Sequence, residues 1–322
     1  MKGESFFMIE IQHVTKRYGD KLAVNDVTFT INKGEILGFL GRNGAGKTTT
    51  MNIITGYISA SSGSVLLDGY DILADPLEVK RRIGYLPELP PLYPDMTVDE
   101  YLRFVCAIKG VKRSRVSAHL NDITELVGLG EVRGRLIRNL SKGYRQRVGM
   151  AQALVGNPEV VILDEPTVGL DPKQILEVRR MIRQLGEDHT IVLSSHILQE
   201  VADVCNRLVI IHQGKIVAED SLEHLTHADG DTRKLRLRIA GPEAEVLQTL
   251  RSMEGVTQAD SLGSLEKESF DFLLQGEAGT DLRRAVFSRM SEKGYPILIQ
   301  RPVDLDLEDV FLQLTGDSRE EA

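Results

Sequence analysis

The first fifty residues alternate between apolar and polar positions in a way that predicts strands. Residues 8–14 (MIEIQHV) and 27–31 (VTFTI) place apolar side chains at nearly every second position, which is the period of a half-buried strand. A short apolar segment, residues 36–40, runs directly into a glycine-rich stretch, and a helical pattern begins at Lys47. A strand, a glycine loop and a helix in this order form the opening unit of an α/β nucleotide-binding core.

The central part of the chain predicts a helical insertion over residues 94–140. Thr97 and Glu100 have the spacing of a capping box, in which each side chain bonds the backbone N–H of the other residue. Apolar positions then share one helical face, first Val98, Tyr101, Leu102, Val105 and Ile108 and then Val116, Leu120, Ile123 and Val127. Beyond this insertion, residues 160–163 and 190–193 form short apolar runs, as in central parallel strands covered on both faces.

A change of pattern near Leu222 predicts a second, smaller domain over residues 222–322. Its expected elements follow the order βαββαβ, which is typical of a ferredoxin-like α+β domain. Strands are expected at residues 235–239, 256–262, 269–274 and 295–300, and helices at 242–250, 280–293 and, as a closing element, 307–314. The fold expected for residues 1–221 is an α/β P-loop domain with the helical insertion.

Composition narrows the class of protein. The 322 residues are 42% hydrophobic and 27% charged, as in ordinary globular proteins, and their number suggests two domains. The 39 Lys and Arg residues against 47 Asp and Glu give a net charge of −8, so we expect no nucleic-acid partner. Cys106 and Cys205 are too far apart for a zinc or disulfide pattern. No apolar run has the roughly 18 residues of a membrane span, so we expect membrane association only through a partner.

Residues 41–48 (GRNGAGKT) match the pattern GxxxxGK[ST] in full. The glycines of this pattern let successive backbone N–H groups point at phosphate oxygens, while the lysine reaches the β- and γ-phosphates and the hydroxyl ligates Mg²⁺. The predicted nucleotide-binding residues are Gly41, Asn43, Gly44, Ala45, Gly46, Lys47, Thr48 and Thr49. Because the loop lies between a predicted strand and a predicted helix, a chance glycine-rich turn has little weight, and we expect ATP or GTP binding.

Two carboxylates, Asp164 and Glu165, follow the apolar strand at residues 160–163. Open α/β sheets bind ligands at the carboxyl ends of their strands. We expect Asp164 to hold the Mg²⁺ ion and Glu165 to act as the general base that orients or deprotonates the attacking water. An acidic pair after a strand is by itself more often a solvated loop or a helix cap, but the phosphate loop favours the catalytic interpretation.

The segment that points to a family is residues 140–147 (LSKGYRQR), shortly before the Asp164–Glu165 strand. Ser141 is placed to cap a following helix. Taken alone, this would be only a well-capped helix. In a phosphate-loop protein the segment makes the chain resemble closely the ATP-binding subunits of ABC transporters, over residues 8 to about 220 and in the family's motif order.

The resemblance implies further site residues. In the family, Ser141 and Gly143 complete the ATP site of the other protomer in a head-to-tail homodimer, and Asp171, in residues 169–172 (GLDP), lies in the loop that crosses the dimer interface. His196 matches the histidine that contacts the γ-phosphate and the attacking water. Tyr18 matches the aromatic residue that stacks on adenine. Without the resemblance, His196 would more often be a structural residue and Tyr18 a strand-end residue.

Two motifs depart from the family pattern. The usual LSGGQ reads LSKGY at residues 140–144, which keeps Ser141 and the second glycine. The loop that normally centres on a glutamine reads YLPE at residues 85–88, and Glu88 is therefore expected to be a Mg²⁺ ligand. This combination resembles bacterial exporters with separately encoded membrane subunits, namely the drug-resistance, sodium-export, gliding-motility and copper-maturation ATPases.

The function expected is ATP hydrolysis that drives a separate membrane permease, with the chain peripheral on the cytoplasmic face of the membrane. The helical insertion is expected to grip the permease. Its basic residues contact the partner or anionic headgroups, or they form a solvated helix face; they are Lys109, Lys112, Arg113 and Arg115. The carboxyl-terminal domain is expected to have a structural or dimer-stabilising role, with a regulatory or docking role as the alternative.

Two other functions remain open at this point. One is an ABC ATPase that acts on ribosomes or nucleic acid, which the single cassette, the lack of a heptad insertion and the negative charge disfavour. The other is a regulator that binds ATP without hydrolysing it, which the intact set of Lys47, Asp164, Glu165 and His196 disfavours.

Overall fold

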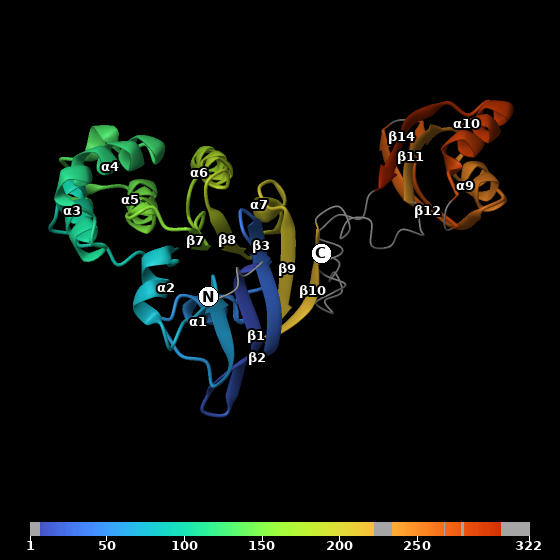
Figure 1. Cartoon of the computed structure of the whole chain (residues 1–322). Helices are drawn as coiled ribbons and strands as arrows, with labels where there is room; N and C mark the ends of the chain where they lie inside the picture. Colours follow the sequence, from blue (N-terminus) through green and yellow to red (C-terminus); the bar gives the residue numbers. More distant parts are fainter. Residues whose placement is uncertain (1–6, 222–233, 267, 278–279, 304–322) are drawn as a thin grey trace. The chain divides into compact units, whose positions relative to one another are not determined.

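The computed structural model describes residues 7–221, 234–266, 268–277 and 280–303. The chain divides into two compact units, Met1–Leu222 and Glu223–Ala322 (Figure 1). Each unit is described by itself. The closing helix expected at residues 307–314 lies outside the described residues. None of the described helices has the length and apolarity that a bilayer span requires.

The amino-terminal unit begins with an antiparallel sheet. Its strands are β1 (Phe7–Tyr18), β2 (Lys21–Asn32), β4 (Ser62–Leu67) and β5 (Tyr70–Asp71), in the order β2-β1-β4-β5. The two strands expected at residues 8–14 and 27–31 are confirmed, and both extend further than the alternation indicates. Alternate side chains such as Ile9, Ile11 and Ile31 are fully buried, so one face of this sheet contributes to the core.

A second sheet of six strands carries the predicted phosphate loop. The strands are β3 (Ile36–Leu40), β6 (Ile83–Leu86), β7 (Val160–Asp164), β8 (Thr190–Ser195), β9 (Arg207–His212) and β10 (Lys215–Ser221). Their order is β10-β9-β3-β8-β7-β6, with only β10 antiparallel to its neighbour. Every residue of β3, β7 and β8 is buried, which confirms the central parallel strands. This is the expected α/β P-loop fold.

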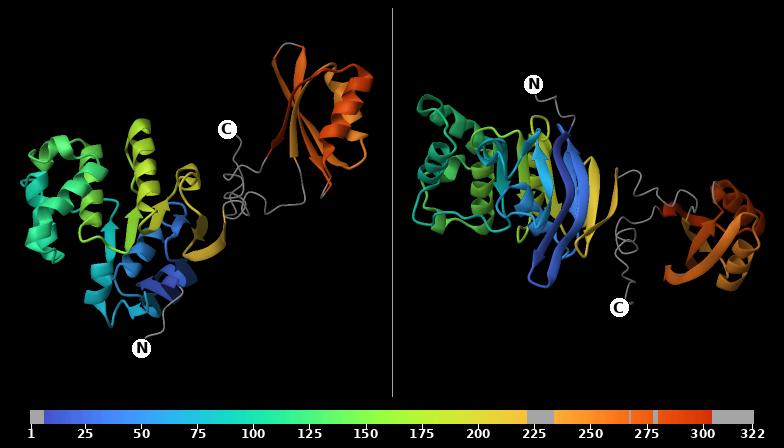
Figure 2. Two further views of the ribbon diagram at one scale, coloured as in Figure 1. Left: turned by 45° about the horizontal axis from the view of Figure 1, so that its top comes forward. Right: turned by 60° about the horizontal axis from the view of Figure 1, so that its bottom comes forward.

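Helices flank this sheet and form a separate group. The helices α1 (Lys47–Ile54), α2 (Pro76–Arg82), α6 (Pro172–Leu185) and α7 (Leu198–Ala202) connect its strands. The helices α3 (Val98–Ile108), α4 (Arg113–Leu126) and α5 (Lys142–Leu154) group together at one side of the unit in both views of Figure 2. The capping box is present, since Thr97 Oγ1 accepts from the Glu100 N–H and the Glu100 carboxylate accepts from the Thr97 N–H.

Two expectations for the insertion are wrong in detail. Val98, Tyr101, Leu102 and Val105 are buried as expected, but 68% of Ile108 is exposed. Ile108 lies at the last turn of α3, where the buried face opens into a groove described below. Lys109 is not a free surface cation, because its ammonium donates to the carbonyls of Lys80 (2.9 Å) and Ile83 (2.8 Å). Burial lowers the pKa of Lys109. Lys112, Arg113 and Arg115 are exposed.

The described part of the carboxyl-terminal unit has the order βαββαβ. Its elements are β11 (Lys234–Ala240), α9 (Glu243–Arg251), β12 (Val256–Glu266), β13 (Ser269–Gly276), α10 (Leu282–Lys293) and β14 (Ile297–Val303), and the sheet order is β12-β13-β11-β14. Leu237 and Phe272 pair in register and belong to its core. The adjacent pair, Arg238 and Asp271, faces the other side of the sheet and forms an ion pair (2.6 Å).

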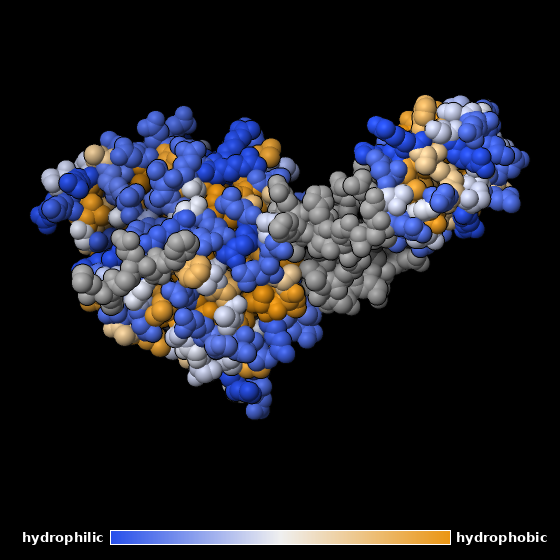
Figure 3. All heavy atoms as spheres, turned by 45° about the vertical axis from the view of Figure 1, so that its right-hand side comes forward, coloured by the Kyte–Doolittle hydropathy of each residue, from blue (hydrophilic) through white to orange (hydrophobic). Residues whose placement is uncertain are grey.

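The surface of the amino-terminal unit is mostly hydrophilic on the face drawn in Figure 3, and its exposed apolar residues form small separate patches. Scattered apolar side chains of this kind are normal on a globular protein. A larger group of exposed apolar residues lines the groove beside the site.

Candidate active site

The order of the parallel strands gathers the predicted site residues at one edge of the sheet. β8 lies between β3 and β7. The segments that leave their carboxyl ends contain the phosphate loop, the Asp164–Glu165 pair and His196. This is the edge at which open parallel sheets bind ligands.

The phosphate loop curls into the amino-terminal end of α1. Gly46 occupies the N-cap position of this helix with φ of 114°, a conformation that favours glycine. A Cβ atom at Gly46 would lie 2.7 Å from the backbone oxygen of Ala23, so a side chain has no room there. Gly44 also has a positive φ, 81°. The loop and the first turn of α1 therefore present backbone N–H groups to an anion.

Lys47 is buried at the centre of this loop. Its ammonium donates to the carbonyl oxygens of Gly41 (2.7 Å) and Arg42 (3.3 Å). The same nitrogen lies 3.2 Å from Oε1 of Glu165, and only about one twentieth of either side chain is exposed. A buried charge requires such a partner, and the structure thus joins two residues that the sequence places in different motifs.

Glu165 connects Lys47 to His196. Its second oxygen, Oε2, lies 2.8 Å from Nδ1 of His196, while 36% of the histidine side chain remains exposed. The backbone of Glu165 has φ of 50°, a left-handed conformation that is rare for residues with a side chain and that concentrates at functional sites. The two residues expected to be catalytic are therefore adjacent, and the carboxylate is held from two sides.

Asp164 has the features of a cation ligand. It is fully buried, its Oδ1 accepts a hydrogen bond from the Ser194 hydroxyl, and its Oδ2 has no hydrogen-bond partner among the described residues. Burial raises its pKa, the hydroxyls of Ser194 and Thr48 oppose this rise, and the nearby carboxylates of Glu165 and Glu88 add to it. A buried carboxylate with one unsatisfied oxygen is stabilised by a cation. Asp164 therefore fits the role of a Mg²⁺ ligand.

Thr48 and Glu88 complete the expected ligand set. Both lie on the wall of the cavity that also reaches Asp164, and both are exposed. In the described part of the chain no three His, Cys, Asp or Glu side chains form a metal cage. Protein sites commonly bind Mg²⁺ through one or two carboxylates together with the phosphates of the substrate, and the residues present here match that kind of site.

The residues expected to act across a dimer lie outside this group. Ser141 caps α5 by accepting from the Tyr144 N–H (3.4 Å), and Asp171 caps α6 by accepting from the Gln174 N–H (2.9 Å). Gly143 packs against the side chain of Gln174, where an added Cβ would lie 2.7 Å from its oxygen. No hydrogen bond or ion pair of the described residues joins Ser141 to Lys47 or Glu165.

Tyr18 ends β1 with 49% of its surface exposed. The ammonium of Lys16 lies 5.2 Å from the centre of its ring, within the range of a cation–π contact. The ring is therefore accessible to a planar ligand, but no described contact links it to the phosphate loop.

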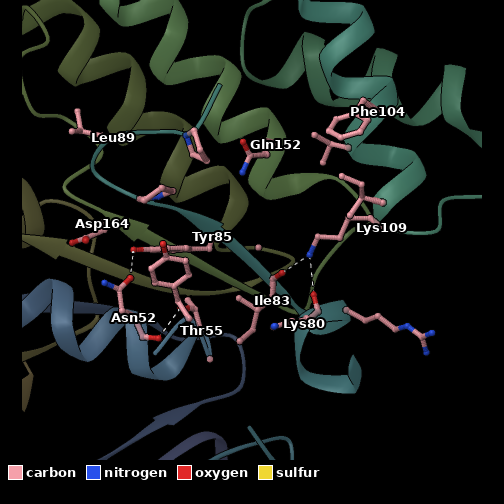
Figure 4. A pocket seen from close by; sticks show the side chains of 18 of the residues that line it. Asn52, Thr55, Lys80, Ile83, Tyr85, Leu89, Phe104, Lys109, Gln152 and Asp164 are labelled. Atoms are coloured by element: carbon pink, nitrogen blue, oxygen red, sulfur yellow. Dashed lines mark hydrogen bonds between the residues drawn. The ribbon is translucent and has the colours of Figure 1, made fainter. Parts of the chain in front are cut away.

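A cavity of about 1120 Å³ extends from the site along the base of the helical group. Figure 4 shows Asp164 and Asn52 toward one end of it and Phe104 and Lys109 toward the other. Its exposed apolar lining includes Tyr57 (78%), Leu89 (81%) and Ile108 (68%). Exposed apolar side chains that line one cavity are typical of an interaction site.

Comparison with known proteins identifies the family. Residues 24–168 match a family model described as ABC transporter. The chain is 38% identical, over 228 residues, to the ABC transporter ATP-binding protein NatA of Bacillus subtilis (strain 168), covering 69% of this chain and 93% of that protein. The chain belongs to the ABC transporter family, as an ATP-binding subunit.

A second relative and a solved structure agree with this assignment. The linearmycin resistance ATP-binding protein LnrL of Bacillus subtilis (strain 168) is 34% identical over 310 residues, which cover 96% of this chain and 98% of that protein. A solved dimeric bacterial ABC transporter cassette is 26% identical and superimposes with a TM-score of 0.62, covering 67% of this chain and 99% of the cassette. The transporter interpretation is therefore favoured over the ribosome-directed and purely regulatory alternatives.

As an ABC ATPase subunit, the protein hydrolyses ATP, and this hydrolysis is coupled to transport. Two residues that contact the expected site residues have no motif of their own in the sequence. Ser194 bonds the Asp164 carboxylate, and Gln174 covers Gly143. Ser194 lies two residues before His196, which is a weak signal for its contact with Asp164. No local pattern indicates the contact of Gln174 with Gly143.

Proposed function

We propose that this ABC ATPase subunit powers export through a separately encoded membrane permease. The proposal rests chiefly on the group formed by Lys47, Glu165 and His196, which has the charges and spacing that hydrolysis of a bound triphosphate requires. Export is supported by likeness to LnrL, whose name assigns it to linearmycin resistance and which matches nearly the whole chain. A drug-like or peptide-like cargo, selected by the permease, fits this relationship.

The contacts of Lys47 and Glu165 suggest how nucleotide binding would prepare the site for hydrolysis. Incoming phosphate oxygens are stronger partners for the Lys47 ammonium than the neutral carbonyls of Gly41 and Arg42, because both members of the new bond are charged. As Lys47 turns toward the phosphates, Oε1 of Glu165 loses its ion-pair partner. This oxygen can then accept a proton from the attacking water. His196 keeps the other carboxylate oxygen in place.

Mg²⁺ would be held by Thr48, Asp164 and Glu88. When bound, the ion neutralises phosphate charge and polarises the bond that breaks. Asp164 enters this role with its Oδ2 free and with Oδ1 fixed by Ser194. The residues of this chain therefore orient the ion rather than surround it.

The working unit would be a head-to-tail homodimer. Ser141 and Gly143 lie at the N-terminal end of α5, and no described contact joins Ser141 to Lys47 of the same chain. The N-terminal end of a helix suits a phosphate, here one bound by another copy of the chain. The dimeric cassette among the solved structures has the same fold. Asp171 and Tyr18 would contact the interface and the adenine ring, respectively.

The permease would dock in the apolar cavity next to the site. Tyr57, Leu89, Phe104 and Ile108 supply exposed apolar surface there, and Thr48 and Asp164 line the same cavity, so a partner seated in it lies next to the phosphates. The chain would then lie on the cytoplasmic face of the membrane through its partner.

Membrane fractionation tests this function. We expect the protein to sediment with membranes of its own cells and to be released from them when Leu89→Asp or Ile108→Asp introduces a charge into the cavity, while ATP binding stays unchanged. Leu73→Asp, at an exposed leucine outside the cavity lining, is the matched control. Recovery of the unaltered protein with ribosomes or nucleic acid instead would contradict the proposal.

A further inference from the structure

A buried carboxylate that belongs to none of the sequence motifs lies beside the active site. Glu200 is in the first turn of α7, and only 6% of its surface is exposed. Within the described part of the chain its carboxylate accepts hydrogen bonds from two hydroxyl groups. A buried carboxylate held in this way is costly to keep charged, which raises the question of what its position contributes.

Both hydroxyl groups bond the same oxygen of Glu200. Oε2 accepts from Thr167 Oγ1 (2.5 Å) and from Ser195 Oγ (3.0 Å), and all three residues are buried. Glu200 therefore fixes the distance between the two chain segments that carry Thr167 and Ser195.

The first of these segments begins at Glu165. The Val168 N–H donates to the Glu165 carbonyl (3.3 Å), and the Leu170 N–H donates to the Thr167 carbonyl (3.1 Å). This compact turn leads on to Asp171 at the start of α6. Because Glu165 itself has a left-handed backbone, a displacement of Thr167 would alter the direction in which the Glu165 side chain leaves the chain.

The second segment carries His196. Ser195 immediately precedes this histidine, and its hydroxyl also accepts from the Ile197 N–H on the other side (3.0 Å). The carbonyl of Ser195 accepts from the N–H of Gly41 (3.3 Å), the first residue of the phosphate loop. Ser195 thus ties His196 both to Glu200 and to the loop that binds phosphate.

We propose that Glu200 is a positioning residue for ATP hydrolysis, which keeps Glu165 and His196 in register by bonding the hydroxyls of Thr167 and Ser195. The inference rests on the catalytic roles proposed for Glu165 and His196. A carboxylate in the first turn of a helix also stabilises that helix. The test must therefore separate an effect on turnover from an effect on folding.

The test is a double-mutant cycle on the full-length protein, with ATP turnover, ATP binding and thermal unfolding measured separately. We expect Glu200→Ala to lower kcat by about tenfold or more, because small displacements of reacting groups have effects of this size. The dissociation constant for ATP should change by less than about threefold, since the phosphate loop is intact. Glu200→Gln retains an acceptor oxygen and should recover part of the lost rate.

Combination with His196→Ala gives the decisive comparison. If Glu200 acts through His196, Glu200→Ala should lower kcat by less than about twofold further in the His196→Ala background, because residues that act as a unit are not additive. Thr167→Val removes one hydroxyl at nearly constant size and carries the test if Glu200→Ala does not fold. Glu187→Gln, at an exposed carboxylate, is the control that should match the unaltered protein.

Three results would overturn the inference. Multiplicative effects of Glu200→Ala and His196→Ala would show independent action. A lower unfolding temperature with unchanged kcat would make Glu200 a purely structural residue. Normal turnover of both His196→Ala and Glu165→Gln would refute the proposed catalytic roles themselves, and this outcome is recognisable without any Glu200 variant.

Discussion

The ammonium of Lys47 lies 3.2 Å from the carboxylate of Glu165, and both side chains are almost fully buried. Each group therefore neutralises the charge of the other. If Glu165 is the base proposed above, this ion pair must be exchanged for contacts with phosphate before Glu165 can accept a proton, and one lysine would then link nucleotide binding to activation of the base.

Glu165→Gln separates binding from hydrolysis. The amide cannot accept the proton of the attacking water, so we expect ATP turnover to fall by about 100-fold or more, while ATP affinity is kept because Lys47 no longer has a competing anion. The variant should also accumulate as a dimer with ATP, which size-exclusion chromatography detects. Unchanged turnover would refute the assigned role of Glu165.

Lys47→Ala should instead lose nucleotide affinity. The substitution removes the cation that would meet the phosphates and takes the Lys47 partner away from Oε1 of the buried Glu165 carboxylate. We expect the dissociation constant for ATP to rise by at least tenfold, or about 1.4 kcal/mol, in a calorimetric titration. Lys112→Ala, at an exposed lysine, should bind ATP normally, and equal affinities of the two variants would contradict this prediction.

Glu88→Ala tests the unusual residue of the loop after β6. If Glu88 is a Mg²⁺ ligand, its removal should shift the Mg²⁺ concentration that gives half-maximal hydrolysis upward. Glu88→Gln, which keeps a neutral oxygen ligand, should give a smaller shift. The measurement is ATP turnover against Mg²⁺ concentration at saturating ATP, and an unaltered dependence would reject the role.

Asp164→Asn should stabilise the nucleotide-free protein at neutral pH. Burial raises the pKa of Asp164 in the folded state, so the contribution of this group is most favourable at low pH, where it is protonated, and is lost as the pH rises through the folded-state pKa. We expect the neutral asparagine to raise the free energy of unfolding at pH 7.

The pH dependence provides the check on that prediction. The difference between Asp164→Asn and the unaltered protein should shrink as the pH is lowered in urea denaturation without Mg²⁺ or nucleotide, since a larger fraction of the aspartate is then protonated. The same variant should lose Mg²⁺-dependent turnover. A stabilisation that persists unchanged at low pH would have a cause other than the buried charge.

Local patterns predicted much of this site because its chemistry is encoded in short segments. The strand, glycine loop and helix around Lys47, the carboxylate pair after β7 and the capping role of Ser141 each depend on neighbours in the chain, so spacing and periodicity reveal them. The fold class follows from the same local elements. The exposure of single side chains is harder to predict. Ile108 is exposed because it borders a groove, and Lys109 is partly buried because its ammonium bonds two carbonyl groups that are distant in the sequence.

The sequence by itself determined which residues this ABC ATPase subunit has available for binding and hydrolysis and on which elements they lie. Only the tertiary structure decided that Lys47 pairs with Glu165, that Oδ2 of Asp164 has no hydrogen-bond partner among the described residues, and that Glu200 bonds hydroxyl groups from two loops. These contacts depend on the strand order β3-β8-β7. Pairing between buried strands that are distant in the sequence sets this order, and no local sequence pattern contains it.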